Sequence, residues 1–328
     1  MKKTILFIHP GLWSFIACDQ TILEERYQVV SFFYQPSKSI ISNLLMQLKL
    51  ILWLLIKIWK ADLLFLWFAD YHTFVPTFLG NMLKKKTVLL LAGYDVTYIP
   101  QIKYGAFSNP IRSFCAGYSI RNADIILPVD DSLGKMAISR VGELRGKMIT
   151  IPFGLDAKDW YCDTPKENFV LTVANIKDQQ TFIRKGIDFY IEVARALPQF
   201  QFVIIGLHEA IHLQNLPKNI DLVKKMDRQK LQNYYSRAKV YAQFSIHEGL
   251  PNVLLEAMLC ECIPVGTNVC GIPTGIGNTG FVIHSMEEAK LAILKFMENE
   301  KTGIEARNRI IDHFNLAQRK EALYEILG

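Results

Sequence analysis

Short apolar runs alternate with amphipathic stretches along the whole chain, and this alternation limits the possible folds more than any other feature. Most apolar runs end at a turn rich in Gly, Pro or Asp. Strands that alternate with helices pair in parallel and are covered by those helices, so the sequence predicts an α/β fold. The expected strands are Ile5–Ile8, Gln28–Phe33, Leu63–Phe68, Val88–Leu91, Asp124–Leu127 and Met148–Ile151, then Phe169–Val173, Phe202–Ile205, Val240–Phe244, Ile263–Val265 and Phe281–Ile283.

The length of the chain predicts two domains. A chain of 328 residues exceeds what one hydrophobic core usually supports. The turn-rich segment 151–156 interrupts the alternation and marks a boundary. We predict a first domain over residues 1–160 and a second over 161–311, with a last helix at about 312–328 that packs back on the first. Sheets of this kind bind ligands at the carboxyl ends of their strands.

Composition and charge exclude several classes of protein. The six cysteines form no CxxC pair and no zinc-finger spacing with histidine, so we expect reduced thiols, no metal site and a cytoplasmic location. The first apolar run ends at His9-Pro10-Gly11, which is too short for a secretion signal. Residues 1–160 hold 18 Lys and Arg against 12 Asp and Glu, which accounts for the whole net charge of +6. No nucleic-acid-binding motif accompanies this charge, so we expect no nucleic acid partner.

The most apolar region of the chain, residues 40–68, is expected to contain an amphipathic helix. Lysines interrupt it, so a membrane-spanning helix is the weaker interpretation. Two other interpretations stay open: a helix lying on anionic lipid at the inner face of the membrane, and a core helix whose lysines are simply solvated. At about 100° per residue, the basic side chains that share or border one face are Lys38, Lys49, Lys57 and Lys60.

Two glutamates stand eight positions apart in residues 245–266, SIHEGLPNVLLEAMLCECIPVG. Pro251 suits the start of a helix, predicted over Leu250–Cys260. Either Glu248 or Glu256 alone could be an ordinary surface charge. Together they resemble the E-x7-E signature of the retaining, nucleotide-sugar-dependent glycosyltransferases of family 4. That family has the GT-B architecture, two Rossmann-like domains facing each other across a cleft.

The resemblance implies roles for the residues of this motif. Glu256 would accept hydrogen bonds from the ribose hydroxyls of the donor. Glu248 would lie near the transferred sugar as a catalytic residue. The backbone N–H groups of Gly249 and Leu250 would meet the diphosphate or the sugar, and the base would lie near Gly206.

The segment Arg184-Lys185-Gly186 resembles the start of the family's donor domain. Lys185, with Arg184 as a helper, would stabilise the diphosphate, so that neither a metal nor another cofactor is expected. The alternative is the solvated start of a helix, where cations oppose the helix dipole; that conflict favours a functional role. The chain departs from the family pattern at Asn175, where many members have an arginine.

The first half would supply the acceptor side of the cleft. His9-Pro10-Gly11 resembles the family's N-terminal glycine loop, although a second glycine is absent, and Gly11 is its candidate residue. Asp95 falls where many members carry His-Asp, and we expect it to act as a catalytic residue that binds or orients hydroxyls. Asp70 and His72 follow a strand end and could line the cleft.

One further glycine motif is rejected as a nicotinamide site. Residues 275–280 match G-x-G-x-x-G, but a predicted strand follows the motif, where the dinucleotide fingerprint needs a helix.

These features predict a retaining glycosyltransferase that moves a sugar from a nucleotide sugar to a glycan or lipid-linked acceptor, in the synthesis of cell-surface polysaccharide or glycolipid. A nucleotide-sugar epimerase of the same fold is a second hypothesis, and it would release a modified sugar without an acceptor. A third is a non-catalytic protein that binds nucleotide sugar or a membrane surface.

Overall fold

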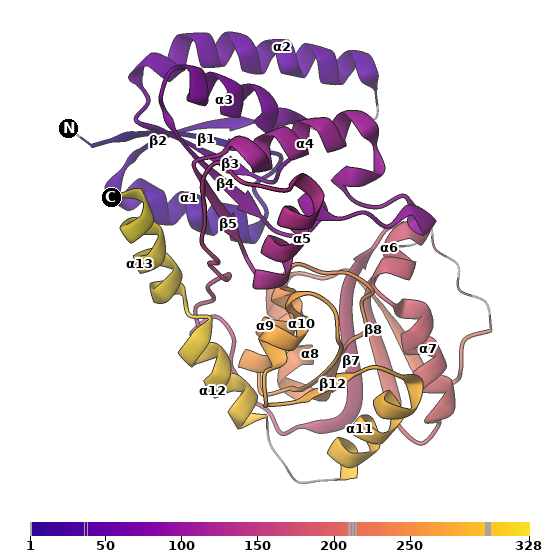
Figure 1. The fold of residues 1–328 in the computed structure, drawn as a ribbon. Helices are drawn as coiled ribbons and strands as arrows, with labels where there is room; N and C mark the ends of the chain where they lie inside the picture. The colour runs from indigo at the N-terminus through magenta and orange to yellow at the C-terminus, as the bar shows by residue number, and fades with distance from the viewer. Residues whose placement is uncertain are drawn as a thin grey trace. The chain divides into compact units, whose positions relative to one another are not determined.

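The computed structural model describes residues 2–35, 37, 39–208, 211, 213, 215–298 and 303–328. The chain forms two compact units, Met1–Pro152 and Phe153–Gly328, each built on a six-stranded parallel sheet (Figure 1). The predicted α/β fold is confirmed. The predicted return of residues 312–328 to the first domain stays a prediction.

The sheet of the first unit has the strand order β2-β1-β3-β4-β5-β6. In Figure 1, α1 lies on one face of this sheet, and α2 and α3 lie on the other. The strands are β1 (Thr4–His9), β2 (Gln28–Phe33), β3 (Leu63–Trp67), β4 (Lys86–Leu91), β5 (Ile125–Pro128) and β6 (Lys147–Met148). The helices are α1 (Ser14–Arg26), α2 (Ile40–Lys57), α3 (Tyr71–Met82), α4 (Pro110–Asn122) and α5 (Asp131–Val141), with short 3₁₀ turns at Ile58–Lys60, Tyr94–Val96, Pro100–Ile102 and Ala106–Ser108.

The sheet of the second unit has the order β12-β11-β10-β7-β8-β9. Its strands are β7 (Glu167–Ile176), β8 (Gln201–Leu207), β9 (Ile220–Lys224), β10 (Ala238–Gln243), β11 (Ile263–Thr267) and β12 (Phe281–Ile283). Its helices are α6 (Gln179–Arg184), α7 (Ile187–Ala196), α8 (Arg228–Arg237), α9 (Asn252–Leu259), α10 (Gly271–Ile276), α11 (Met286–Glu298), α12 (Ile304–His313) and α13 (Leu316–Leu327). One core cluster joins α7 and α11 to the central strands.

The central strands are buried on both faces, which is why they read as continuous apolar runs in the sequence. From Ile5 onward, every residue of β1 is buried, and so is every residue of β3. Side chains that accept hydrogen bonds from the first helical turn start most of the helices between these strands. These capping residues are Ser39, Asp70, Asn109, Asp130, Asp178, Asp227 and Asn315.

Two strands differ from the sequence prediction. The edge strand β9 was not predicted, because its sequence, IDLVK, is half exposed and has no continuous apolar run. The strand expected over Met148–Ile151 pairs with β5 only at Lys147 and Met148. The glycine motif at residues 275–280 begins inside α10 and ends just before β12. A strand therefore follows the motif, where a dinucleotide fingerprint needs a helix.

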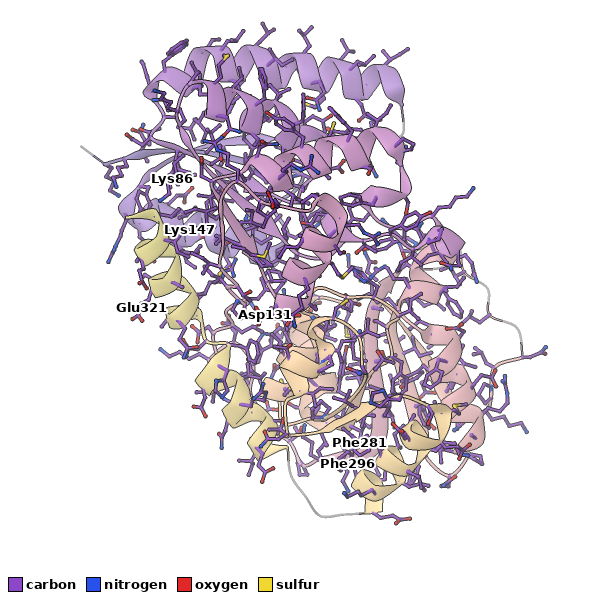
Figure 2. All side chains as sticks on the ribbon, in the orientation of Figure 1. Lys86, Asp131, Lys147, Phe281, Phe296 and Glu321 are labelled. Atoms are coloured by element: carbon purple, nitrogen blue, oxygen red, sulfur yellow. The ribbon has the colours of Figure 1, made fainter. Side chains whose placement is uncertain are left out.

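Helix α2 presents most of its apolar side chains to the outside of its unit. Figure 2 shows side chains projecting from the face of α2 that is turned away from α3. Leu50 and Leu54 are fully buried on the opposite side. The exposed apolar residues cover about 120° of the helix circumference; they are Ile41, Leu44, Leu45, Leu48, Leu52, Leu55 and Ile56.

This exposure argues against the interpretation of α2 as an ordinary core helix. Lys49 is exposed at one border of the apolar stripe, and Lys57 is exposed about 100° beyond that border, on the same side of the helix. Lys60 follows α2, and Lys38 lies outside the described residues. Among the described residues, Ile41–Lys60 is the helical segment whose length and mean hydropathy of 1.7 would allow it to cross a membrane, and only 17% of that window is buried.

Candidate active site

The second sheet has a topological switch point between β7 and β10. Counted from β7 as the first strand, its order is the 3-2-1-4-5-6 of dinucleotide-binding sheets. The chain leaves β7 toward β8 on one side, and leaves β10 toward β11 on the other. Loops that follow the two central strands therefore diverge at their carboxyl ends, which is where open α/β sheets bind ligands.

The backbone brings the segment after β7 against the end of β10. Gly186 adopts a left-handed conformation (φ 63) between α6 and α7, and a Cβ there would lie 1.9 Å from the Phe244 carbonyl oxygen. The Ile246 N–H donates to the Arg184 carbonyl oxygen over 2.9 Å. A glycine is required at 186 for both its conformation and this close approach.

This contact places two of the predicted catalytic residues in one ion pair. Lys185 Nζ donates to Glu248 Oε1, and Arg184 lies 3.7 Å from the same oxygen. Ser245 Oγ donates to that carboxylate over 2.9 Å. The side chains of Lys185 and Glu248 are only 15% and 11% exposed. The site therefore holds two cations and one carboxylate with little access to bulk water.

The charges in this cluster stabilise one another. Burial raises the pKa of Glu248, but Lys185 and Arg184 together hold it below its ordinary value. Burial lowers the pKa of Lys185, and the carboxylate of Glu248 opposes that effect. The Glu248 carboxylate is thus kept ionised beside its cations.

A chain of buried hydrogen bonds behind Glu248 was not predicted from the sequence. Tyr241 Oη donates to Gln243 Oε1 over 3.1 Å, and Gln243 Nε2 donates to Ser245 Oγ over 2.8 Å. Thr267 Oγ1 then donates to the Ser245 carbonyl oxygen over 2.6 Å. The period-two spacing of 241 and 243 in β10, continued to 245 just past its end, was the available signal, because alternate strand residues share one face.

Glu256 lies inside the apolar helix α9. Its carboxyl accepts from Tyr235 Oη over 3.4 Å. Burial raises the pKa of Glu256 to about 7, and the opposing influences of Arg228 and Tyr235 are smaller. Glu256 is therefore a carboxyl group that changes charge near neutral pH. The helix begins at Asn252 with Pro251 as its N-cap, slightly later than predicted.

The remaining predicted donor-side residues occupy tight backbone positions. Gly249 is buried, and its carbonyl oxygen accepts from the Gly271 N–H over 2.9 Å, so the loops after β10 and β11 are joined. Leu250 is buried beside it. Gly206 in β8 has φ 101, and a Cβ there would lie 2.1 Å from the Ala174 carbonyl oxygen. Asn175, where the family pattern has arginine, is an exposed residue of β7.

One inference from the sequence was wrong. Arg184 and Lys185 were interpreted as cations at the start of a helix, where they would oppose the dipole. In the structure, Arg184 is the last residue of α6 and Lys185 is its C-cap. The dipole of α6 favours cations at that end, but Lys185 also directly precedes Gly186, the N-cap of α7, whose dipole opposes them. Because the two dipoles act in opposite directions, the dipole gives no argument for function. The burial of the pair with Glu248 takes the place of that argument.

The residues predicted on the acceptor side all lie in the first unit. His72 is buried, its Nε2 is 2.8 Å from the Trp67 carbonyl oxygen, and burial lowers its pKa. Asp95 is fully buried and accepts from the N–H groups of Ala92 (3.1 Å) and Gly93 (2.8 Å). Burial raises the pKa of Asp95 to about 6. Both side chains hold their own loops in place.

Gly11 follows β1, and Asp70 follows β3. These two neighbouring strands flank the topological switch point of the first sheet, where the strand order reverses. Gly11 is partly exposed beside the ring of Trp13. Asp70 caps α3 and lies 3.3 Å from Arg112 Nε. The expectation that Gly11, His72 and Asp95 contact an acceptor stays a prediction. Within the described residues, no group of His, Cys, Asp and Glu is placed to hold a metal ion.

Residues 164–313 match the family described as "Glycosyl transferases group 1". A curated relative, the alpha-galactosylglucosyldiacylglycerol synthase of Streptococcus pneumoniae, is 26% identical over 260 residues. The match covers 70% of this chain and 68% of the relative. The family match includes the segment that contains the Lys185–Glu248 pair.

Solved structures with the same fold cover nearly the whole chain. Sucrose-phosphate synthase from Thermosynechococcus elongatus has a TM-score of 0.76 at 14% identity, covering 99% of this chain and 98% of that one. HepE from Anabaena, in complex with UDP and glucose, has a TM-score of 0.74 at 17% identity, covering 99% of both chains. The fold is GT-B, and together with the family match it makes this chain a glycosyltransferase.

Proposed function

We propose that this glycosyltransferase takes a sugar from a nucleotide-sugar donor and transfers it, with retention of anomeric configuration, to a lipid-linked acceptor at the cytoplasmic face of a membrane. The observation that carries the proposal is the buried Lys185–Glu248 pair, with Arg184 beside it, at the switch point of the second sheet. The exposed apolar face of α2 supports the acceptor class.

The cations at the switch point suit the leaving group of such a reaction. Breaking the bond between a sugar and a nucleoside diphosphate leaves growing negative charge on the diphosphate. Lys185 and Arg184 are already fixed in a poorly solvated position, so they can stabilise that charge without reorganising. This chemistry needs no metal ion.

Glu248 suits the positive charge that develops on the transferred sugar. A glycosyl centre that loses its leaving group gains oxocarbenium character, and an ionised carboxylate nearby stabilises it or holds the sugar hydroxyls. The ion pair keeps Glu248 ionised, and Ser245 fixes one of its oxygens. Retention rests on the resemblance of Glu248 and Glu256 to the E-x7-E signature of retaining enzymes.

Glu256 suits the ribose of the donor. A carboxylate accepts hydrogen bonds from both hydroxyls of a ribose, and its position within α9 is fixed by the packed helix. HepE has the same fold (TM-score 0.73), and its complex with UDP-glucose supports a nucleotide sugar as donor. The name of the pneumococcal relative supports a diacylglycerol glycolipid as the kind of product.

A panel of nucleotide sugars tests the donor class. A ligand that binds only the folded state raises the midpoint of thermal unfolding, so the correct donor should stabilise the protein by several degrees. The stabilising donor is then incubated with and without membrane lipid, and the products are separated. A glycolipid whose new linkage keeps the donor's anomeric configuration by NMR is expected. A modified free sugar formed from donor alone would identify an epimerase and overturn the proposal.

A further inference from the structure

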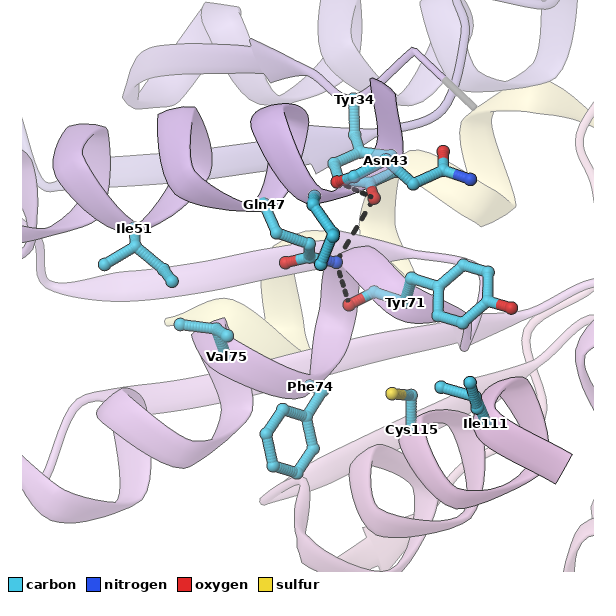
Figure 3. A pocket seen from close by; sticks show the side chains of 10 residues that line it. Tyr34, Asn43, Gln47, Ile51, Tyr71, Phe74, Val75, Ile111 and Cys115 are labelled. Carbon is cyan, nitrogen blue, oxygen red and sulfur yellow. Dashed lines mark hydrogen bonds between the residues drawn. The ribbon is translucent and has the colours of Figure 1, made fainter. Parts of the chain in front are cut away.

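The first unit contains an apolar pocket of about 380 Å³ between α2, α3 and α4 (Figure 3). Its volume lies in the range of small-molecule sites. It is formed by the amino-terminal halves of these helices, which follow β2, β3 and β4, so it lies toward the carboxyl ends of the strands. The apolar side chains of its wall are Leu44, Ile51, Phe74, Val75, Ile111 and Cys115.

The pocket is continuous with the exposed apolar face of α2. Leu44 belongs to both, since it lines the pocket and is 64% exposed. Ile111, on the other rim, is 66% exposed at the start of α4. An aliphatic chain that leaves a hydrocarbon layer against α2 could therefore enter the pocket without crossing a charged surface.

The polar groups of the pocket are gathered on one wall and are mostly paired with one another. Figure 3 shows Gln47 Nε2 donating to the Tyr71 carbonyl oxygen (2.8 Å) and to Tyr34 Oη (3.2 Å). Gln47 Oε1 is buried and accepts no hydrogen bond from the described part of the chain. The pocket thus offers one hydrogen-bond acceptor within an otherwise apolar wall.

The ionisable groups that line the pocket favour a neutral occupant. Burial raises the pKa of Tyr34 to about 12 and that of the Cys115 thiol to about 11, so both are uncharged at neutral pH. Arg112, which lies over the Tyr71 ring, is paired with Asp70. Among the described residues that line the pocket, an anionic headgroup would find no free cation.

We propose that this pocket takes one alkyl chain of the lipid acceptor, with a hydroxyl near the chain's head donating to Gln47 Oε1. This inference rests on the proposed transfer to a lipid, and it narrows the class of lipid that can be the acceptor. The acceptor carries at least one linear aliphatic chain, and a single chain leaves the bilayer to enter the first unit. The pocket would select the acceptor by its chain, while the second unit binds the donor.

Binding of a simple alkyl probe tests the pocket without any catalysis. We expect 1-octanol to stabilise the wild-type protein against thermal unfolding, and 1-methoxyoctane, which cannot donate to Gln47 Oε1, to stabilise it less. Cys115→Trp should fill the pocket and abolish the effect of 1-octanol. Ile138→Trp, on an exposed site of α5, is the matched control and should keep it. Equal stabilisation of wild type and Cys115→Trp, or none of wild type, would overturn the proposal.

A second variant guards against misfolding of the first. Val75→Phe fills less of the pocket and should weaken 1-octanol binding in proportion. Each ligand methylene that can no longer be buried raises the Kd by a constant factor, about tenfold for every two methylenes. If Cys115→Trp fails to fold, the comparison of Val75→Phe with Ile138→Trp decides the question by the same criterion.

Kinetics with a lipid acceptor distinguish two possible occupants of the pocket: an alkyl chain of the acceptor and an alkyl chain of an ordinary membrane lipid. For Cys115→Trp we expect KM for the lipid acceptor to rise about tenfold or more, with vesicle binding and stabilisation by the nucleotide sugar unchanged. Loss of vesicle binding without a change in KM would assign the pocket to bulk lipid and overturn the acceptor role. Failure of the proposed function would appear elsewhere, as a wild-type protein that no nucleotide sugar stabilises.

Discussion

Lys185 and Glu248 form a buried ion pair although they are 63 residues apart in the sequence. The two loops that carry them follow the neighbouring strands β7 and β10. Each side chain would be costly to bury alone, and each removes most of that cost for the other. The pair is therefore structural and chemical at once, and its two roles can be separated by mutation.

Removing the lysine alone should destabilise the protein and stop transfer. Lys185→Met leaves the Glu248 carboxylate buried beside Arg184 only, and we expect a loss of about 3–5 kcal/mol in the free energy of unfolding. Adding Glu248→Gln removes the unpaired charge and should restore part of the stability, but not the activity. Urea unfolding and turnover of the identified donor measure the two effects.

The exposed pair of Arg195 and Glu192 in α7 is the control, because surface pairs contribute little. Arg195→Met should change the free energy of unfolding by less than about 1 kcal/mol and leave turnover intact. If the double variant of Lys185 and Glu248 regains both stability and turnover, the pair has no catalytic role.

The carboxyl of Glu256 should make donor binding depend on pH. Its folded-state pKa is about 7, so the group becomes an acceptor-only carboxylate as the pH rises through 7. We expect the donor's Kd to fall by roughly tenfold between pH 6 and pH 8 in the wild type. Glu256→Gln should show a weak, nearly constant Kd, measured by calorimetry. A variant with the wild-type pH profile would contradict the ribose role.

The same group should destabilise the fold at high pH. Its pKa is raised from 4.5 to about 7, so the folded state holds the proton more tightly than the unfolded state. The free energy of unfolding therefore falls as the pH rises between about 4.5 and 7, and then levels off. Glu256→Gln should flatten this slope, by roughly 1–3 kcal/mol across the window. Glu321→Gln, on an exposed site of α13, should leave the slope unchanged.

Gly186 should tolerate no side chain. Gly186→Ala places a Cβ in a left-handed conformation and against the Phe244 carbonyl oxygen, so the contact between the two loops must open. We expect a loss of more than about 1 kcal/mol and a fall in kcat, because Lys185 is the adjacent residue. Gly117→Ala within α4 is the control: its Cβ would meet only Val141 Cγ1 at 3.7 Å, so stability should rise by about 0.5–1 kcal/mol.

Helix α2 should bind anionic vesicles through its exposed side chains. Leu48→Gln combined with Leu52→Gln removes apolar area from the exposed face, and we expect at least a tenfold loss of vesicle affinity at any salt concentration. Lys49→Gln, at the border of that face, should lose roughly fivefold, and only at low salt. Leu291→Gln, equally exposed on α11, is the control in a sedimentation assay. Unchanged sedimentation of both α2 variants would refute membrane docking.

The parallel sheets could be predicted because their inner strands are buried on both faces and so leave continuous apolar runs. The edge strand β9 could not, since Asp221 and Lys224 are exposed and no alternation marks it. Short α6 was missed for the same reason: its sequence, QQTFIR, is mostly polar. Its absence from the prediction led to the wrong dipole argument for Arg184 and Lys185.

The identity of the charged residues in the candidate site could be predicted, but their pairing could not. The motif around Glu248 named the residue, while its ion pair depends on the turn at Gly186, which packs against β10 far along the chain. The supporting hydrogen bonds of Gln243 and Ser245 depend on side-chain rotamers. For α2, the sequence showed the lysines, but only the packing shows which apolar side chains remain exposed.

The two borders of the α2 stripe differ, and this difference would give the first unit a defined roll angle if α2 lies on a lipid surface. Lys49 lies at one border, and Leu44 and the other α2 residues of the apolar pocket lie at or beyond the opposite border. A helix with lysines on both borders could rock about its long axis at little cost. If α2 docks on lipid as proposed, attraction of Lys49 to anionic headgroups would draw that side toward the lipid. This attraction would set how deeply the opposite side, where Leu44 and the pocket lie, is immersed. The lipid's surface charge would then regulate access to the pocket, although none of the described residues that line it is charged.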